Sequence, residues 1–173
     1  MMVFSSERLR LRKLNRDDID FVLAVTNDPQ WMTYMGDRGI NSSQSASRYI
    51  NVTSDSFTTA GYGLWLVETK QGDGERRIGL CGLIKRPFLS CPDVGYAFLP
   101  QGRGQGYATE AVSLVLHWAA RHTREGQVSA ICRPDNRASL KVLERSGFCY
   151  IGQLFNHDQP RHNLYLKSLS ELR

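Results

Sequence analysis

The segment Gly-Tyr-Ala-Phe-Leu-Pro-Gln-Gly-Arg-Gly-Gln-Gly-Tyr-Ala-Thr-Glu-Ala, residues 95 to 111, decides the fold of this chain. It starts inside a predicted strand over residues 94 to 99, which Pro100 ends because proline has no N–H for a sheet ladder. Glycines follow at 102, 104 and 106, and the apolar positions after them recur with helical spacing. A strand, a glycine loop and a helix start direct several unpaired backbone N–H groups at one point. The segment therefore predicts a phosphate site.

The residues after the glycines distinguish this loop from other phosphate loops. A P-loop needs Lys followed by Ser or Thr where this chain has Tyr107 and Ala108. A dinucleotide loop, counted from Gly104, needs a third glycine where Thr109 stands. The His-Arg-Asp segment of a protein kinase is absent. Arg103 lies within the loop and would add a full positive charge to the phosphate site.

The loop resembles the pyrophosphate loop of the GCN5-related N-acetyltransferases, whose pattern is Arg/Gln-x-x-Gly-x-Gly/Ala. Two registers fit, Gln101-x-x-Gly104-x-Gly106 and Arg103-x-x-Gly106-x-Ala108. The second is preferred because it makes Ala-Thr-Glu-Ala, residues 108 to 111, the first helical turn, as in the Rim-type (RimJ/RimL-like) ribosomal-protein N-acetyltransferase branch. The resemblance implies acetyl-CoA as co-substrate. It assigns the pyrophosphate to Arg103, Gly104, Gln105, Gly106, Tyr107 and Ala108.

A second segment fits the same family pattern. A short apolar strand over residues 128 to 132 precedes a helix that starts at Asn136 and ends at Gly147, a residue suited to a left-handed C-cap. In the family the corresponding Asn-x-x-Ser/Ala…Gly-Phe motif places the Asn amide on the pantetheine arm. The resemblance therefore assigns Asn136 to the cofactor. Asn136 is equally suited to capping the helix, and the two roles are compatible.

The rest of the chain fits one α/β domain over residues 1–173. The resemblance implies a mixed seven-stranded sheet, flanked by helices, whose fourth and fifth strands splay apart to admit acetyl-CoA. It gives Phe98 and Leu99 as the residues whose backbone groups bind the pantetheine and the oxyanion. A helix is predicted to open near Asn15, another near Ser42 or Ser43, and a short turn at residues 31 to 36. Strands are expected at residues 8–12, 63–68, 78–85, 93–99, 128–132, 149–154 and 163–167, with a hairpin turn at 71–75.

Composition excludes several other classes of protein. No run approaches the roughly 18 apolar residues of a membrane span, and no signal peptide is evident, so a cytoplasmic protein is expected. The four cysteines and four histidines show no zinc-site spacing, so reduced thiols and no metal are expected. The net charge of +5 suits a solvated surface, an anionic cofactor or an acidic protein substrate, and no basic block argues for nucleic acid. A homodimer is left open.

The reaction needs a neutral amine, a stabilised oxyanion and a proton for the leaving thiolate. An α-amine with a pKa near 7.7 to 8.0 is neutral in about one molecule in ten at pH 7, far more often than a lysine side chain. Asp93 stands where this branch often places a base, although it is equally a turn residue after Pro92. Many relatives carry a tyrosine acid where this chain has Leu143, and the resemblance gives Ser139 that role instead.

The acceptor is the least determined part of the prediction. Trp31, Tyr34 and Trp65 are candidates to line its pocket, though an aromatic side chain is more often part of a core. A peptide would enter between residues 27–40 and 155–162, where Asp37, Asp158 and Arg161 are candidates to contact its charges. Three functions remain: N-acetylation of a protein N-terminus or of a small amine such as a polyamine or amino sugar, non-catalytic CoA or nucleotide binding, and a structural domain whose glycines only make a turn.

Overall fold

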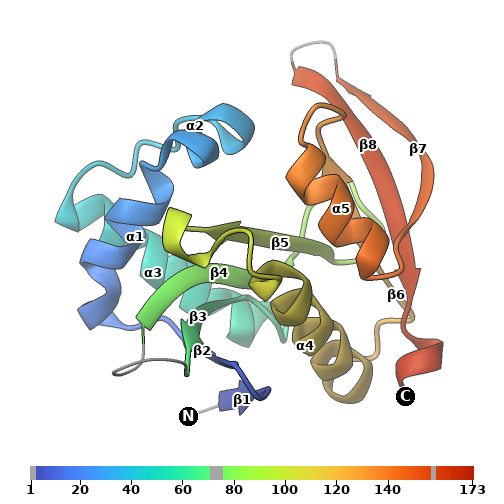
Figure 1. Ribbon diagram of the computed structural model, residues 1–173, viewed down its shortest axis with the longest axis horizontal. Coiled ribbons are helices and arrows are strands. Elements are labelled where there is room, and N and C mark those ends of the chain that lie inside the picture. Colours follow the sequence, from blue (N-terminus) through green and yellow to red (C-terminus); the bar gives the residue numbers. More distant parts are fainter. Residues whose placement is uncertain (1–2, 71–75, 157–158) are drawn as a thin grey trace.

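Eight strands form one mixed sheet in the computed structural model, which describes residues 3–70, 76–156 and 159–173 (Figure 1). Their order across the sheet is β1-β2-β3-β4-β5-β6-β8-β7. Every neighbouring pair is antiparallel except β5 and β6, which are parallel. The strands are β1 (Val3–Ser5), β2 (Leu9–Lys13), β3 (Leu64–Thr69), β4 (Arg76–Ile84), β5 (Asp93–Phe98), β6 (Gln127–Cys132), β7 (Cys149–Asn156) and β8 (Gln159–Ser168).

Helices cover both faces of this sheet. The α-helices are α1 (Ile19–Thr26), α2 (Pro29–Met35), α3 (Ser43–Thr59), α4 (Tyr107–His122) and α5 (Arg137–Arg145), with 3-10 turns η1 (Arg16–Asp18), η2 (Pro100–Gly102) and η3 (Ser170–Leu172). In the described residues, no helix has both the length and the hydropathy needed to cross a membrane. Helices α1 to α3 lie on one side of the view, and α4 and α5 lie on the other (Figure 1).

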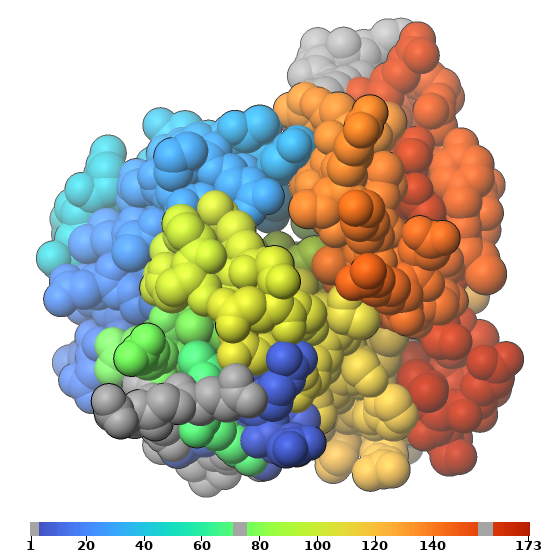
Figure 2. Space-filling view, in the orientation of Figure 1, coloured from blue at the N-terminus to red at the C-terminus, as the bar shows by residue number. Residues whose placement is uncertain are grey.

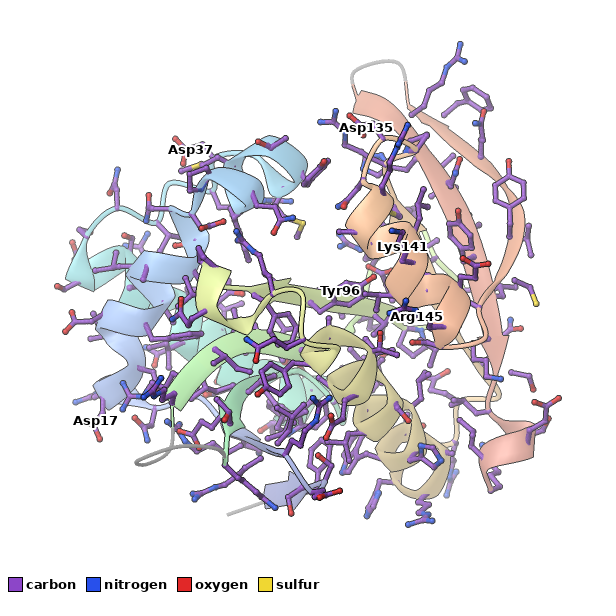
Figure 3. All side chains as sticks on the ribbon, viewed as in Figure 1. Asp17, Asp37, Tyr96, Asp135, Lys141 and Arg145 are labelled. Carbon is purple, nitrogen blue, oxygen red and sulfur yellow. The ribbon has the colours of Figure 1, made fainter. Side chains whose placement is uncertain are left out.

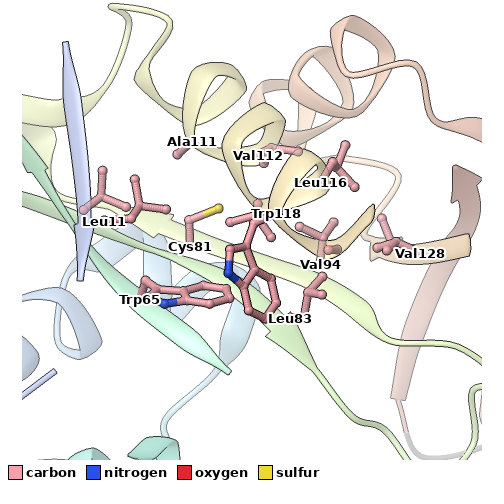
Figure 4. Close-up of a cluster of buried hydrophobic side chains, with 14 of the residues drawn as sticks. Leu11, Trp65, Cys81, Leu83, Val94, Ala111, Val112, Leu116, Trp118 and Val128 are labelled. Carbon is pink, nitrogen blue, oxygen red and sulfur yellow. The ribbon is translucent and has the colours of Figure 1, made fainter. Parts of the chain in front are cut away.

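Alternation along the strands divides the buried residues into two cores. Trp65 and Val67 of β3 pack in a core with α4, while Leu66 between them packs with α1 and α3. Successive side chains of a strand point to opposite faces, so this split follows from the pleat. In the α4 core the indole of Trp65 meets that of Trp118 edge to face, with 4.7 Å between the ring centroids (Figure 4). The wide, aromatic-filled core holds α4 firmly against the strands that precede the glycine loop.

Two expectations from the sequence need correction. The sheet has eight strands instead of seven, because Ser6 makes a tight turn that returns a short β1 against β2; its N–H donates to the Leu9 carbonyl at 3.0 Å. Residues 31 to 36, expected as a turn, belong mostly to helix α2, which Asp28 caps by accepting from the Gln30 N–H at 2.9 Å. Proline at the first helical position favours that start. The expected hairpin turn at 71–75 lies outside the described residues.

The predicted separation of two central strands is confirmed. Strands β5 and β6 register through one pair of residues, Asp93 and Ser129, although each strand has six residues. Beyond that pair the strands diverge, and α5 lies over β6 while α2 and η2 lie over the far end of β5 (Figure 1). The resulting gap between the strands is called the wedge below. It leaves backbone groups of β5 without a neighbouring strand.

Candidate functional site

Asp93 closes the narrow end of the wedge. Its side chain is 1% exposed, and it accepts hydrogen bonds from Arg86 Nε at 2.6 Å and from the Ile131 N–H at 3.2 Å. Ser129 N–H adds a bond to the Pro92 carbonyl at 2.8 Å. Burial raises the pKa of Asp93 to about 6, against the opposing effect of the Arg86 charge and hydrogen bond. The carboxylate that the sequence offers as a base thus joins β5 to β6.

The wedge exposes alternate residues of β5. Leu99 N–H donates to the Ile78 carbonyl of β4 at 2.9 Å, and the Leu99 carbonyl accepts from Gly102 N–H at 2.8 Å. In an antiparallel pair the next residue points its N–H the other way, so Phe98 and Tyr96 present theirs to the open side. The Phe98 carbonyl accepts from Arg103 Nε at 2.8 Å. Phe98 therefore keeps an N–H for a ligand in the wedge, and the expectation for Leu99 is wrong because both of its backbone groups are used.

The glycine loop ends in an open helix N-terminus. Gly104 and Gly106 have φ of +73° and +79°, a region that other residues rarely adopt, and Gly106 is the N-cap of α4. Among the described residues, no hydrogen bond occupies the backbone N–H groups of Gly104, Gln105, Gly106 or Ala108. Tyr107 is buried beneath them. Several donors at the positive end of a helix dipole make a site for a phosphate, as the sequence predicts.

The charge of Arg103 is directed away from this N-terminus. The guanidinium pairs with Asp28, the capping residue of α2, while its Nε bonds the Phe98 carbonyl. Arg103 thereby ties the loop to α2 and to β5. The expectation that Arg103 supplies an unpaired charge to the phosphate is not met in this arrangement, in which the donors around the loop are backbone N–H groups.

A second tie to the loop comes from the N-terminal segment, and the sequence reasoning missed it. Arg8 pairs with Glu110 in the first turn of α4, donates to the Gln105 carbonyl at 3.0 Å and lies over the Tyr107 ring. Ser6 Oγ donates to the other Glu110 oxygen at 2.5 Å. The ion pair neutralises a carboxylate beside the anion site. Ser6 and Arg8 are separated from Glu110 by 104 and 102 residues, so no local pattern in the sequence links them to the loop.

Helix α5 faces the wedge from the β6 side with Asn136 and Ser139. Asn136 Oδ1 accepts from the Ser139 N–H at 3.2 Å, which makes Asn136 the N-cap and leaves its amide N–H groups for a ligand. Ser139 Oγ lies 2.7 Å from the hydroxyl of Tyr96, which reaches across from β5 (Figure 3). Burial raises the pKa of Tyr96, so this hydroxyl stays protonated. Tyr96 lies within the segment of residues 95 to 111, but no role in the site was expected for it.

Leu143 confirms that this helix lacks the tyrosine acid of many relatives. The side chain is 1% exposed and packs in the α4 core, where an ionisable group would be costly. Burial also raises the pKa of the thiols of Cys81 and Cys132, which keeps both protonated. In the described residues, His, Cys, Asp and Glu side chains form no cluster that could hold a metal ion.

A cavity of about 820 Å³ lies beside the wedge, between α2, α3 and the ends of β4 and β5. Trp31 lines it as expected, but Tyr34 does not: its ring lies 5.4 Å from the guanidinium of Arg133. Trp65 is fully buried in the α4 core, so its expected place in the pocket is wrong. Charged groups that line the cavity are Arg38, Arg48, Asp55, Lys85 and Arg86.

The residues expected to contact a peptide are otherwise occupied or undescribed. Asp37 accepts from the Gly39 N–H at 2.7 Å in a local turn, and Arg161 stacks over Phe155. Asp158 lies outside the described residues. Arg133 donates to the Thr33 carbonyl at 3.0 Å and so joins the β6–α5 loop to α2. Figure 2 shows a hollow between α2, the η2–α4 segment and α5.

A second hollow, of about 550 Å³, extends from Gly106 along α4 to the end of α5. Arg145 and Lys167 line it, and Lys141 lies on the same helix as Arg145 (Figure 3). Gly106, the N-cap of α4, lines the same hollow, so the two cations lie in one hollow with this helix N-terminus. Lys167 is also paired with Glu171 at 3.5 Å.

Comparisons with known proteins identify the family of this chain. A family model described as acetyltransferase (GNAT) domain matches residues 8–149. The uncharacterized protein YkkB of Bacillus subtilis (strain 168) is 28% identical over 158 residues, which cover 90% of each chain. RimL, a ribosomal L7/L12 alpha-N-protein acetyltransferase solved with coenzyme A, has a TM-score of 0.82 at 18% identity, covering 96% of this chain and 98% of that one. MccE, the microcin C7 self-immunity acetyltransferase solved with acetyl-CoA and AMP, has a TM-score of 0.78 at 16% identity, covering 94% and 93%.

The similarity to RimL and MccE shows that the fold is shared. The family model matches most of the chain, so it shows the family. The glycine loop, the wedge and the Asn136 helix all lie within the matched residues. The chain belongs to the GNAT acetyltransferase family, and it is an N-acetyltransferase whose acetyl donor is acetyl-CoA.

Proposed function

We propose that this enzyme transfers the acetyl group to the α-amine of a protein N-terminus by direct attack in a ternary complex. The observation that carries the proposal is the wedge, which is open between the N–H cradle and the 820 Å³ cavity. A donor bound in the wedge would reach the cavity without passing through the protein interior. No acyl-enzyme is required, since an amine attacks a thioester directly, and burial keeps the thiols of Cys81 and Cys132 protonated.

The residues around the wedge fit acetyl-CoA part by part. The N–H groups of residues 104 to 108 would hold the pyrophosphate, with Gly106 at the helix start. Arg145 and Lys167 would bind the 3′-phosphate in the cationic hollow. The Phe98 N–H and the Asn136 amide would bind the pantetheine arm. When bound, acetyl-CoA supplies the activated acetyl group, and the protein supplies position and protons.

The Ser139–Tyr96 pair is the proposed proton source for the leaving thiolate. Tyr96 stays protonated. In the proposed scheme its hydroxyl donates to Ser139 Oγ, 2.7 Å away, which would leave the serine proton to point into the wedge. Ser139 acts as the acid in this scheme, and Tyr96 positions it. The pair would replace the tyrosine that Leu143 removes from the helix.

This pair has a kinetic test. Ser139→Ala should lower kcat while leaving the dissociation constant of CoA nearly unchanged, because its proton is used only in the transition state. Tyr96→Phe should lower kcat less, and the double variant should be no slower than Ser139→Ala alone. Equal losses of kcat and CoA affinity would make Ser139 a binding residue. Independent, additive losses would separate the two hydroxyls.

The choice of an α-amine rests on the acceptor's own acidity. Asp93 is joined to Arg86 and closed off from the cavity by burial, and Asp55 is the one carboxylate among the described residues that line the cavity. With so little base available, an amine that is already neutral in about one molecule in ten at pH 7 suits the site better than a lysine side chain. A base role for Asp93 stays a prediction, tested below.

The deciding experiment compares short peptides with free and blocked N-termini at matched lysine content, following CoA release. We expect acetylation of free N-termini and none of blocked ones. Acetylation that survives blocking would identify lysine as the acceptor. Activity confined to polyamines or amino sugars would move the enzyme to small-amine acceptors, and CoA binding without transfer to any amine would indicate a non-catalytic domain.

A further inference from the structure

We infer that the acceptor carries a negatively charged group close to its reactive amine, and that an N-terminus followed by acidic residues is the preferred substrate. This inference rests on the function proposed above and names the chemistry of its acceptor. It is carried by the walls of the 820 Å³ cavity, whose volume lies in the range of built ligand sites.

The charges that line the cavity do not balance. Arg86 is neutralised by Asp93, and Asp55 is the one carboxylate among the described lining residues, against three further cations. Arg38, Arg48 and Lys85 remain, and among the described residues none of the three forms an ion pair. Arg48 and Lys85 make no hydrogen bond to the described residues either. A cavity with surplus positive charge attracts anions and repels polyamines.

The polar groups of the apolar wall are donors. Trp31 is 8% exposed, and its indole N–H has no hydrogen-bond partner in the described structure. An unpaired buried donor is unfavourable, and a ligand atom that accepted a hydrogen bond from it would remove that penalty. Burial raises the pKa of Tyr49 to about 12, so its hydroxyl, which hydrogen-bonds the side chain of Thr53, also remains neutral. Donors and cations together match a carboxylate or phosphate.

The reactive amine and the anion would occupy different parts of the cavity. Tyr96 and Ala97 of β5 line the end next to the wedge, where the acetyl group would arrive. Arg38 and Arg48 come from the α2–α3 connection and from α3, on the opposite wall. An N-terminal amine at the β5 end would meet the acetyl group there, and the acidic side chains that follow it would meet the arginines on the α3 side. A polyamine would place a second cation against the arginines.

The first test uses peptides of equal length and identical first residue, with amidated C-termini, and Glu or Asp against Gln or Asn at the next positions. We expect kcat/KM to favour the acidic peptide by about two- to fivefold per charge, the range for partly exposed ion pairs. The preference should shrink as salt is raised, because exposed charges are screened. Free amino acids with a side-chain carboxylate form a separate arm. Acetylation of these alone would place the anion on a small molecule and overturn the peptide assignment.

Two substitutions should move the preference in opposite directions. Arg48→Gln should lower the acidic-to-neutral ratio of kcat/KM, and Asp55→Asn should raise it, with Arg121→Gln on α4 as the matched control outside the cavity. CoA affinity measured on each variant reports whether it is folded. Equal use of acidic and neutral peptides by the wild type would refute this inference and leave the proposed function standing. Failure of both peptides with acetylation of polyamines would refute both.

Discussion

Substituting Asp93 with asparagine should change how the stability of the protein depends on pH. Asp93 is almost completely buried where β5 meets β6, and burial raises its pKa from the ordinary 3.8 to about 6 even with Arg86 beside it. Asparagine keeps the shape and removes the titration. The effect measured is the difference in unfolding free energy between wild type and variant as pH varies.

The sign of this pH dependence follows from which state, folded or unfolded, binds the Asp93 proton more tightly. The folded protein binds the Asp93 proton more tightly than the unfolded chain, so this group favours folding at low pH. Its contribution is lost as pH rises from the unfolded pKa near 3.8 through the folded pKa near 6. The whole interval is worth about 3 kcal/mol, at about 1.4 kcal/mol per pH unit. About 1.3 kcal/mol of it falls between pH 5 and pH 7.

The assay is urea unfolding of both proteins at several pH values between 5 and 7. On raising the pH to 7, wild type should lose about 1.3 kcal/mol more stability than Asp93→Asn. The exposed Asp17→Asn serves as a control for the loss of a surface carboxylate. Parallel curves for wild type and Asp93→Asn would refute the reasoning. They would mean that Arg86 and the Ile131 N–H hold the carboxyl near its ordinary acidity.

The same variant tests the base role. A base that takes the amine proton matters most where the acceptor is protonated. The ratio of variant to wild-type turnover should then fall as pH is lowered from 8 toward 6. A flat ratio would leave Asp93 with the structural role alone.

Three further predictions concern the cofactor site. Gly106→Ala should weaken CoA binding by at least tenfold, because φ at this position is +79°. The control is Gly126→Ala, at a glycine that lies in open space and has no positive φ, and it should leave CoA binding unchanged. Calorimetry measures the dissociation constant of CoA for both variants. Arg8→Gln should weaken CoA binding, because it leaves the Glu110 carboxylate without its ion pair beside the pyrophosphate. Adding Glu110→Gln should restore part of the lost affinity. No recovery in the double variant would contradict the explanation that the Glu110 charge repels the pyrophosphate. Asn136→Ala should weaken binding by about 1–3 kcal/mol, and an unchanged dissociation constant would make Asn136 a cap alone.

The parts of the site that could be read from the sequence are those encoded by neighbouring residues. Glycines at 104 and 106 before a helical pattern specify positive φ and a free helix N-terminus, and the structure has both. Asn136 and Gly147 mark the two ends of α5 in the same local way. In each case the residues of one short segment are enough to determine where the helix begins or ends. The separation of β5 and β6, by contrast, came from the family resemblance and was not visible in either strand.

The predictions that failed concern residues whose roles depend on contacts between segments far apart in the sequence. Leu99 and Phe98 are adjacent and similar in type, and the register of β5 on β4 alone decides which of them keeps a free N–H. Arg103 was expected to face the phosphate, but Asp28, which lies 75 residues earlier, takes its charge. Nothing next to Arg103 in the sequence distinguishes these outcomes, because an ion pair has no local pattern.

The places of Trp31 and Trp65 also could not be predicted from neighbouring residues, and the place of Trp31 bears on the acceptor. Trp31 and Trp65 look equivalent in the sequence, yet Trp65 packs in the core with α4, while Trp31 lines the cavity. The indole N–H groups of both lack a hydrogen-bond partner among the described residues. The difference lies in which face of the sheet each helix covers. A net charge of +5 likewise does not show where the cations gather. Once α2 and α3 are placed, the three cations that form no ion pair among the described residues line one cavity, and their position there supports the inference of an acidic acceptor.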